Sequence, residues 1–121
     1  MTGSAAGKEF VVAVTDMLAP LGSINWTRFF GGYALKSADV QFAMAMKGTL
    51  YLRADAKLAA ELAGKGSLPF AYETKRGRVS VDTYYSIPED WLDDADVLAG
   101  WAARSIAAAR ASRKRASGRK R

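Results

Sequence analysis

The chain has 121 residues, 50% of them apolar and 11% aromatic, which suits one domain with an ordinary core and argues against a disordered chain. Cysteine and histidine are both absent, which excludes disulfides, thiolate metal sites, the commonest general base and the commonest transition-metal ligand. The net charge of +6 is concentrated at one end, because residues 110–121 hold seven basic and no acidic residues, whereas 1–109 hold 11 basic and 12 acidic ones.

The first predicted element is a helix from about Ala5 to Leu18, in which apolar residues recur at every third or fourth position. Pro20 predicts the end of this helix, because proline disfavours helical geometry in the residue before it. Four strands are then predicted from β-branched and aromatic residues and from alternating hydrophobicity, over residues 24–30, 33–36, 40–46 and 49–53.

Glycines mark the junctions of these strands. Gly31-Gly32 permits a bend or bulge after the first strand, and Lys47-Gly48 suits a hairpin turn in which the glycine takes a positive φ. In the third strand, strict alternation predicts that four apolar side chains share one face of the sheet: Val40, Phe42, Met44 and Met46.

The second half of the chain predicts a helix, a hairpin and a last helix. Asp55 is expected to cap a short helix that ends near Ala63. The hairpin has strands over residues 70–74 and 79–85, joined by a basic turn. The last helix is rich in alanine and continues to or beyond Ala109.

The predicted order is therefore α-β-β-β-β-α-β-β-α. Short links between strands predict antiparallel pairing, because parallel neighbours need long crossovers. We expect an α+β domain over residues 1–109, in which helices pack on one face of an antiparallel sheet built from hairpins, followed by a basic, disordered tail over 110–121. No apolar run reaches the roughly 20 residues of a membrane span and no signal peptide is recognisable, so a cytoplasmic protein without membrane contact is expected.

The stretch from Arg28 to Tyr33 reads Arg-Phe-Phe-Gly-Gly-Tyr. It resembles the signature Arg-x-Met-Phe-Gly-Gly-Tyr/Phe-Gly of the N-terminal domain of the TfoX/Sxy regulators. Phe29 stands where this family usually has methionine, and Ala34 stands where it usually has glycine. Arg28 is expected to pair with a local carboxylate or a helix C-terminus, with an exposed anion contact as the alternative. The signature positions, to which a structural role is assigned, are Arg28, Phe30, Gly31, Gly32 and Tyr33.

Later segments resemble the same family in the same order. Leu50–Arg53 is similar to its "Leu-Tyr-Leu-Lys" strand, Pro69–Tyr72 to its "Pro-Phe-x-Tyr", and Tyr84–Glu89 to its "Tyr-Tyr-x-Val-Pro-Glu". The resemblance covers residues 8–109 and identifies the chain as a TfoX/Sxy family member, expected to be a single-domain one without the helical C-terminal domain that the family usually carries.

The resemblance implies a regulatory domain of α+β type. In the namesake proteins it implies a positive regulator of genes for DNA uptake, that is, of competence for transformation. Those regulators are thought to act with the cyclic AMP receptor protein rather than as free-standing readers of DNA sequence. The implied partner is therefore a protein such as a transcription factor or a polymerase component.

Nothing in the sequence marks a catalytic, cofactor or metal site. Gly31-Gly32 fits neither a P-loop nor a dinucleotide-binding loop, which need further glycines at fixed spacing before a helix. Asp93, Asp94 and Asp96 lack the ligand spacing of a calcium loop and are expected to compensate the charge of a helix N-terminus. We therefore expect no enzymatic activity, no catalytic residues, no cofactor and no metal.

Aromatic side chains are numerous for so small a domain. Most are expected in the core and on the sheet faces, and a few exposed ones would form a protein-binding patch. The residues concerned are Trp26, Phe29, Phe30, Tyr33, Phe42, Tyr51, Phe70, Tyr72, Tyr84 and Tyr85.

Basic residues at two places are candidate nucleic-acid contacts, because lysine and arginine neutralise phosphates without reading sequence. They lie in the tail and in the turn of the second hairpin: Arg110, Arg113, Lys114, Arg115, Arg119, Lys120 and Arg121, with Lys75, Arg76 and Arg78. The alternative function is thus a non-specific nucleic-acid-binding protein, which requires the tail and the turn to lie on the same side. Otherwise the tail is a solvated end or contacts an acidic protein surface.

Overall fold

The structure is a computed structural model that describes the backbone of residues 3–29 and 31–119 and the side chains of 7–29 and 31–113. Its element order confirms the predicted α+β class, with the predicted helices and strands in the predicted succession. The elements are α1 (Gly3–Met17), η1 (Ala19–Leu21), β1 (Ile24–Phe29), β2 (Gly32–Ser37), β3 (Val40–Met46), β4 (Thr49–Arg53), α2 (Ala56–Gly64), β5 (Pro69–Thr74), β6 (Gly77–Ser86), η2 (Glu89–Asp93) and α3 (Ala95–Arg119), where η is a 3-10 helix.

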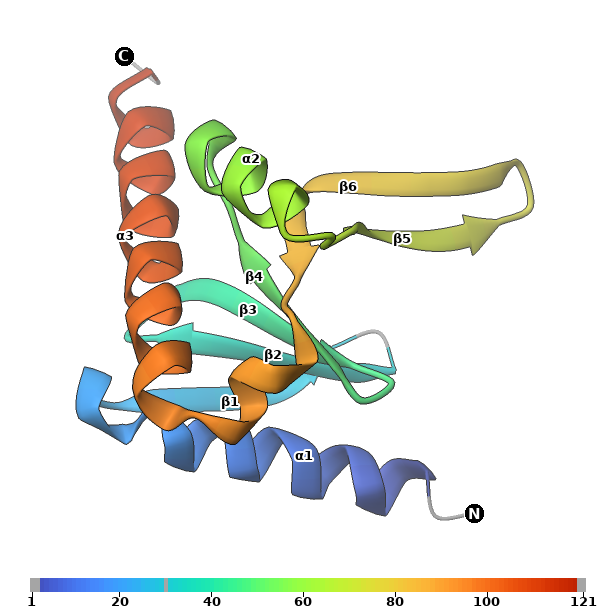
Figure 1. Cartoon of the computed structure of the whole chain (residues 1–121). Helices are drawn as coiled ribbons and strands as arrows, with labels where there is room; N and C mark the ends of the chain where they lie inside the picture. The colour runs from blue at the N-terminus through green and yellow to red at the C-terminus, as the bar shows by residue number, and fades with distance from the viewer. Residues whose placement is uncertain (1–2, 30, 120–121) are drawn as a thin grey trace.

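The strands form one antiparallel sheet in the order β1-β2-β3-β4-β6-β5 (Figure 1). The helices share one face of it, as predicted, because a single buried cluster joins residues of all three helices to the sheet. Its members include Val11 and Val14 of α1, Leu58 and Leu62 of α2, Leu98, Ala102 and Ile106 of α3, and Leu35, Phe42 and Leu52 of the sheet. Among the described residues, no helix combines the length and the apolar character needed to cross a membrane.

A β-bulge in β3 changes which side chains face this core. Leu35 pairs with Ala43 but Lys36 pairs with Gln41, so Phe42 is an extra residue opposite β2. An extra residue reverses the alternation beyond it. Val40 and Phe42 therefore belong to the core, where Ala43 and Ala45 follow them, whereas Met44 and Met46 point to the opposite face. The prediction that all four apolar side chains share one face is wrong for the two methionines.

The bulge is tied to α3 by a buried serine. The side chain of Ser105 is 0% exposed, and its hydroxyl oxygen lies 2.8 Å from the carbonyl oxygen of Phe42 and 2.7 Å from that of Arg53. A serine hydroxyl has one proton, so it donates to one of these carbonyls at a time. Buried carbonyls without a donor are costly, and Ser105 therefore holds α3 over the ends of β3 and β4.

The last helix continues beyond Ala109, as predicted, and so extends past the predicted end of the domain. α3 runs through to Arg119 instead of giving way to a disordered tail after residue 109, although Lys120 and Arg121 lie outside the described residues. Two of the arginines contact the sheet: Arg110 donates to the Ser37 hydroxyl at 3.0 Å, and Arg113 lies 2.8 Å from the Asp39 carboxylate. The extension is therefore anchored at the turn between β2 and β3.

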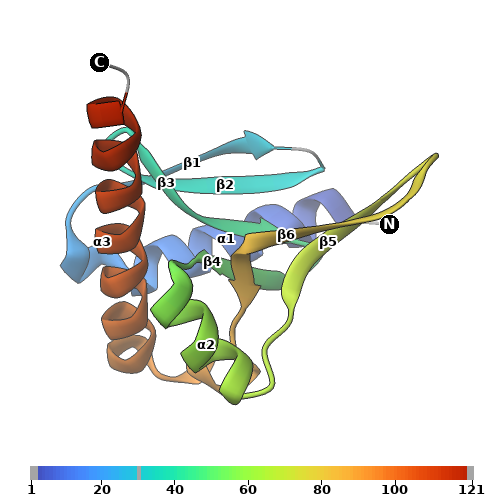
Figure 2. The same ribbon diagram turned by 90° about the horizontal axis from the view of Figure 1, so that it is seen from above.

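The β5–β6 hairpin projects from the sheet as an arm (Figures 1 and 2). β6 pairs with β4 only through Tyr84, Tyr85 and Ser86, and its partner on β5 then jumps from Pro69 opposite Tyr85 to Phe70 opposite Val81. This irregularity marks the place where β6 leaves β4. Beyond it, β5 and β6 have only each other as sheet partners.

Candidate functional site

The sheet face opposite the helices, together with the arm, forms an open groove of about 940 Å³. We call it the open-face groove. Its lining residues come from every strand except β2, and also from the turns between strands. Aromatic and methionine side chains are the largest groups among them. The lining residues are Phe29, Gly31, Gln41, Met44, Met46, Lys47, Thr49, Tyr51, Phe70, Ala71, Tyr72, Glu73, Arg78, Val81 and Tyr84.

An aromatic ladder leads from the floor of the groove onto the arm. The ring centroids of Tyr51 and Phe70 are 5.1 Å apart in an edge-to-face arrangement, and those of Phe70 and Tyr72 are 6.1 Å apart. The register places Val81 opposite Phe70 and Val79 opposite Tyr72, so these side chains share one face of the arm. The apolar surface of the sheet thus continues along the arm, where Tyr72 is 47% and Val79 37% exposed.

The floor of the groove contains the two methionines that the bulge turns away from the core. Met44 is buried and Met46 half-buried, and both line the groove. Methionine is flexible and polarisable, so it adapts to irregular apolar surfaces and is common at binding surfaces that accept varied partners. Sequence reasoning missed them because the alternation from Val40 onward appeared unbroken, and no turn residue signals the bulge.

Charged side chains lie at the rim. Lys47 occupies the turn between β3 and β4, and Arg78 and Glu73 form an exposed ion pair of 3.7 Å across the arm. Lys75 and Arg76 follow in the turn of the arm, where both are exposed. The rim and the adjacent turn therefore carry more positive than negative charge.

The structure describes four of the five signature residues, which lie at and beside the turn between β1 and β2. Gly31 has a φ of +81° at the turn between β1 and β2, a conformation that favours glycine. Gly32 is buried, and a Cβ there would overlap the main-chain oxygen of Ala45 and the Met46 sulfur. The Arg28 guanidinium lies over the Tyr33 ring, 6.0 Å from its centroid, rather than on a carboxylate. Phe30 lies outside the described residues.

The two groups of candidate nucleic-acid contacts are far apart. The arm, with Lys75, Arg76 and Arg78, and the end of α3 lie at opposite sides of the domain in both views (Figures 1 and 2). Lys114, Arg115 and Arg119 belong to α3, but their side chains lie outside the described part. The single basic surface required by the alternative function is therefore not formed by the described elements.

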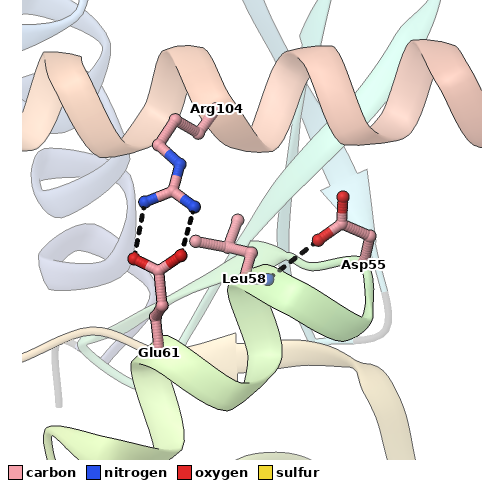
Figure 3. A network of polar contacts seen from close by, with 4 residues as sticks. All are labelled: Asp55, Leu58, Glu61 and Arg104. Carbon is pink, nitrogen blue, oxygen red and sulfur yellow. Dashed lines mark hydrogen bonds and ion pairs between the residues drawn. The ribbon is translucent and has the colours of Figure 1, made fainter.

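A second, smaller cleft of about 260 Å³ lies where α2, α3 and β6 meet. Arg53 lines it and is already engaged, because its guanidinium donates to the Ser112 hydroxyl at 3.1 Å and lies 5.8 Å from the centroid of the Tyr84 ring. Asp55 also lines the cleft, and its carboxylate accepts the Leu58 amide at 2.8 Å as the predicted helix cap (Figure 3). These polar groups stabilise the junction of the elements.

Two carboxyl groups have pKa values displaced by ion pairs. The Glu61 carboxylate accepts two hydrogen bonds from Arg104, at 2.9 and 2.6 Å, which link α2 to α3 and lower the pKa of Glu61 (Figure 3). Hydrogen bonding and charge from Arg113 lower the pKa of Asp39 in the same way. Asp94 caps α3 by accepting the Val97 amide at 3.2 Å, as expected for an acidic residue at a helix N-terminus.

The Glu61–Arg104 pair predicts a specific pH dependence of stability. Because the folded pKa of Glu61 lies below its ordinary value of 4.5, the stabilisation is present above that pH and is lost as the pH falls through the folded pKa. Glu61→Gln should therefore destabilise slightly at neutral pH, and its difference from the native chain should shrink in acid. Thermal unfolding from neutral pH to pH 3 measures this difference, and Arg104→Gln should show the same convergence. A difference independent of pH would contradict the assignment.

Comparison with known proteins places the groove inside a recognised domain. A family model described as the TfoX N-terminal domain matches residues 16–109, a range that includes every groove-lining residue. The chain is also similar to Protein Sxy of Escherichia coli (strain K12), with 36% identity over 74 residues. The matched region makes up 61% of this chain and 35% of Sxy, so the chain spans a minor part of that relative's length.

Proposed function

This chain belongs to the TfoX N-terminal domain family, and from that premise we propose that it is a non-enzymatic regulatory or adaptor domain that acts on gene expression through a protein partner. One observation supports this most: the open-face groove presents aromatic and methionine side chains that the described residues leave partly exposed, among them Met46, Tyr51, Phe70 and Tyr72. Large exposed apolar surfaces on a small domain are typical of sites that bind other proteins.

The proposed genes are those for DNA uptake, because the similarity to Sxy lies in this domain. The proposed partner is a transcription factor such as the cyclic AMP receptor protein, or a polymerase component. Enzymatic chemistry has no part in this role, since binding energy at an apolar groove needs neither a nucleophile nor a general base.

Calorimetric titration of the purified chain into purified cyclic AMP receptor protein, with and without cyclic AMP, and into RNA polymerase tests this role. We expect saturable binding to one of them that survives nuclease treatment. In a naturally transformable host, overproduction of the chain should raise the transcripts of DNA-uptake genes. Unchanged transcripts together with absent binding would contradict the proposed function.

A second candidate function is non-specific binding of nucleic acid by the basic end of the chain alone, without the arm, favoured by the density of basic residues there. Arg110 and Arg113 are best left in place in a test, because they contact the β2–β3 turn. If the five others bind phosphates, replacing them with glutamine should make the slope of log K against log salt shallower by about 4.5 for duplex DNA, as fluorescence anisotropy can measure. An unchanged slope would exclude the end of α3 as the binding element. The residues to replace are Lys114, Arg115, Arg119, Lys120 and Arg121.

A further inference from the structure

We propose that the open-face groove binds an amphipathic helix with acidic flanks, contributed by a partner protein, and that the arm closes one side of this site. The proposal rests on the proposed function, because it specifies the chemistry of the partner at the same groove. Three observations carry it: the shape of the apolar lining, the exposed apolar face of the arm, and the charge of the rim.

The lining favours inserted apolar side chains over stacked bases. Tyr51 and Phe70 meet edge to face, with an interplanar angle of 76°, so the two rings do not lie in one plane as a flat platform. The half-buried Met46 supplies adaptable apolar surface in the groove, beside the buried Met44. An amphipathic helix inserts residues at i, i+3, i+4 and i+7 into grooves of this kind, and the groove volume of about 940 Å³ leaves room for several such side chains.

The arm has an apolar face that the described residues leave partly exposed. Tyr72 and Val79 are direct cross-strand partners, and they are 47% and 37% exposed. The alternate cross-strand positions carry the charged pair Glu73 and Arg78 and the small pair Ala71 and Ser80. A two-stranded ribbon is only marginally stable in water, so an amphipathic one gains stability when a partner covers its apolar face.

The rim indicates the charge of the occupant. Lys47 lies in the turn between β3 and β4, and Lys75 and Arg76 lie in the turn of the arm. The charge of Arg78 is balanced by its ion pair with Glu73. Among the described residues that line the groove, Glu73 is the acidic one. Acidic residues beside the apolar anchors of a helix would complement this rim, whereas basic ones would be repelled.

The test uses a fluorescein-labelled synthetic helix of about five turns, with leucine and phenylalanine at i, i+3, i+4 and i+7 and glutamate at the flanking positions. Fluorescence anisotropy should show saturable binding to the full chain. The same peptide with lysine in place of glutamate should bind at least about tenfold more weakly, a loss that shrinks with added salt. Equal binding of the two peptides, or no saturable binding of the acidic one, would overturn the proposal.

Matched variants locate the site. Val79 and Val97 are each 37% exposed, but Val79 lies on the arm and Val97 at the start of α3. Val79→Glu should weaken binding of the acidic peptide at least about tenfold, and Val97→Glu should leave it unchanged. Both positions are partly exposed, so both variants should fold, as circular dichroism can verify. If both variants weaken binding equally, the groove is not the site.

A pair of charge variants tests the rim separately. The double variant Lys47→Glu with Arg76→Glu reverses two positive charges, one at the rim and one in the turn of the arm. The control, Lys8→Glu with Lys57→Glu, makes the same charge change on exposed residues of α1 and α2. We expect a loss of binding from the first pair and near-native binding from the second. Equal losses would show that net charge alone attracts the peptide. Saturable binding of a labelled oligo-dT strand that Val79→Glu abolishes, without peptide binding, would reassign the groove to single-stranded nucleic acid.

The outcomes separate this proposal from the proposed function. If Val79→Glu binds the transcription partner as well as the native chain does, the groove is not the docking site, although a protein-binding role stands. The native chain could instead bind the acidic peptide through the groove and bind none of the tested transcription proteins. The proposal for the groove would then be upheld, and the proposed regulatory function would be contradicted.

Discussion

Gly32→Ala is expected to destabilise the domain strongly. The added Cβ would overlap the main-chain oxygen of Ala45 and the sulfur of Met46. The sulfur can move, but the main-chain oxygen belongs to the neighbouring part of β3, so the strands themselves would have to shift. Overpacking of this kind costs about 1–3 kcal/mol and sometimes more. Chemical denaturation measures it as a fall in the midpoint.

Gly31→Ala is the matched control for this prediction. Gly31 has a φ of +81°, and no described residue other than its chain neighbours lies within 4 Å of the position of its Cβ. The cost of alanine there is conformational only, about 1–2 kcal/mol for a left-handed residue with a side chain. Gly31 is thus favoured by its backbone conformation, whereas Gly32 is favoured by the lack of space for a Cβ. A larger loss for Gly31→Ala than for Gly32→Ala would contradict the close approach of β2 to β3.

Ser105→Ala is expected to have the second large effect. The Ser105 hydroxyl lies in hydrogen-bonding range of the Phe42 and Arg53 carbonyls in a fully buried position. Removing the donor leaves buried carbonyl oxygens unsatisfied, at a cost of about 1–3 kcal/mol. Because α3 and the bulge are both held at this point, hydrogen exchange should also rise around Phe42.

Ser112→Ala controls for the intrinsic effect of replacing serine by alanine on the same helix. Ser112 is only half-buried, and its hydroxyl accepts a hydrogen bond of 3.1 Å from Arg53. We expect a change within about 0.5 kcal/mol, as for other surface substitutions. Denaturant unfolding measures the midpoint of both variants. Similar falls in the midpoint for Ser105→Ala and Ser112→Ala would show that the buried carbonyls do not depend on Ser105.

The candidate site was partly predictable. An exposed set of aromatic residues was one of two interpretations of the sequence, and Tyr72 on the arm is such a residue, while Phe42 lies in the core. The methionines of the groove were not predicted to be there. Their position depends on Phe42 being an extra residue in β3, which is decided by how β2 and α3 pack rather than by the composition of the strand.

The sequence by itself determined the succession of helices and strands, the antiparallel hairpins, the cap of α2, the turn between β3 and β4, and the family to which the chain belongs. These follow from interactions among near neighbours: Asp55 caps the turn that it precedes, and Lys47 and Gly48 both adopt the positive φ values of a tight hairpin. Interactions between near neighbours depend on the order of residues along the chain, so periodicity and turn residues suffice to predict them.

Only the tertiary structure decided which face of each strand is buried beyond the bulge, how β6 leaves β4 to form the arm, and where α3 ends. α3 continues past residue 109, where Arg110 and Arg113 contact Ser37 and Asp39, more than 70 positions earlier in the chain. The groove likewise joins β1, β3, β4 and the arm. Contacts between residues so distant in sequence leave no periodic signal, because they depend on packing and not on the order of neighbouring residues.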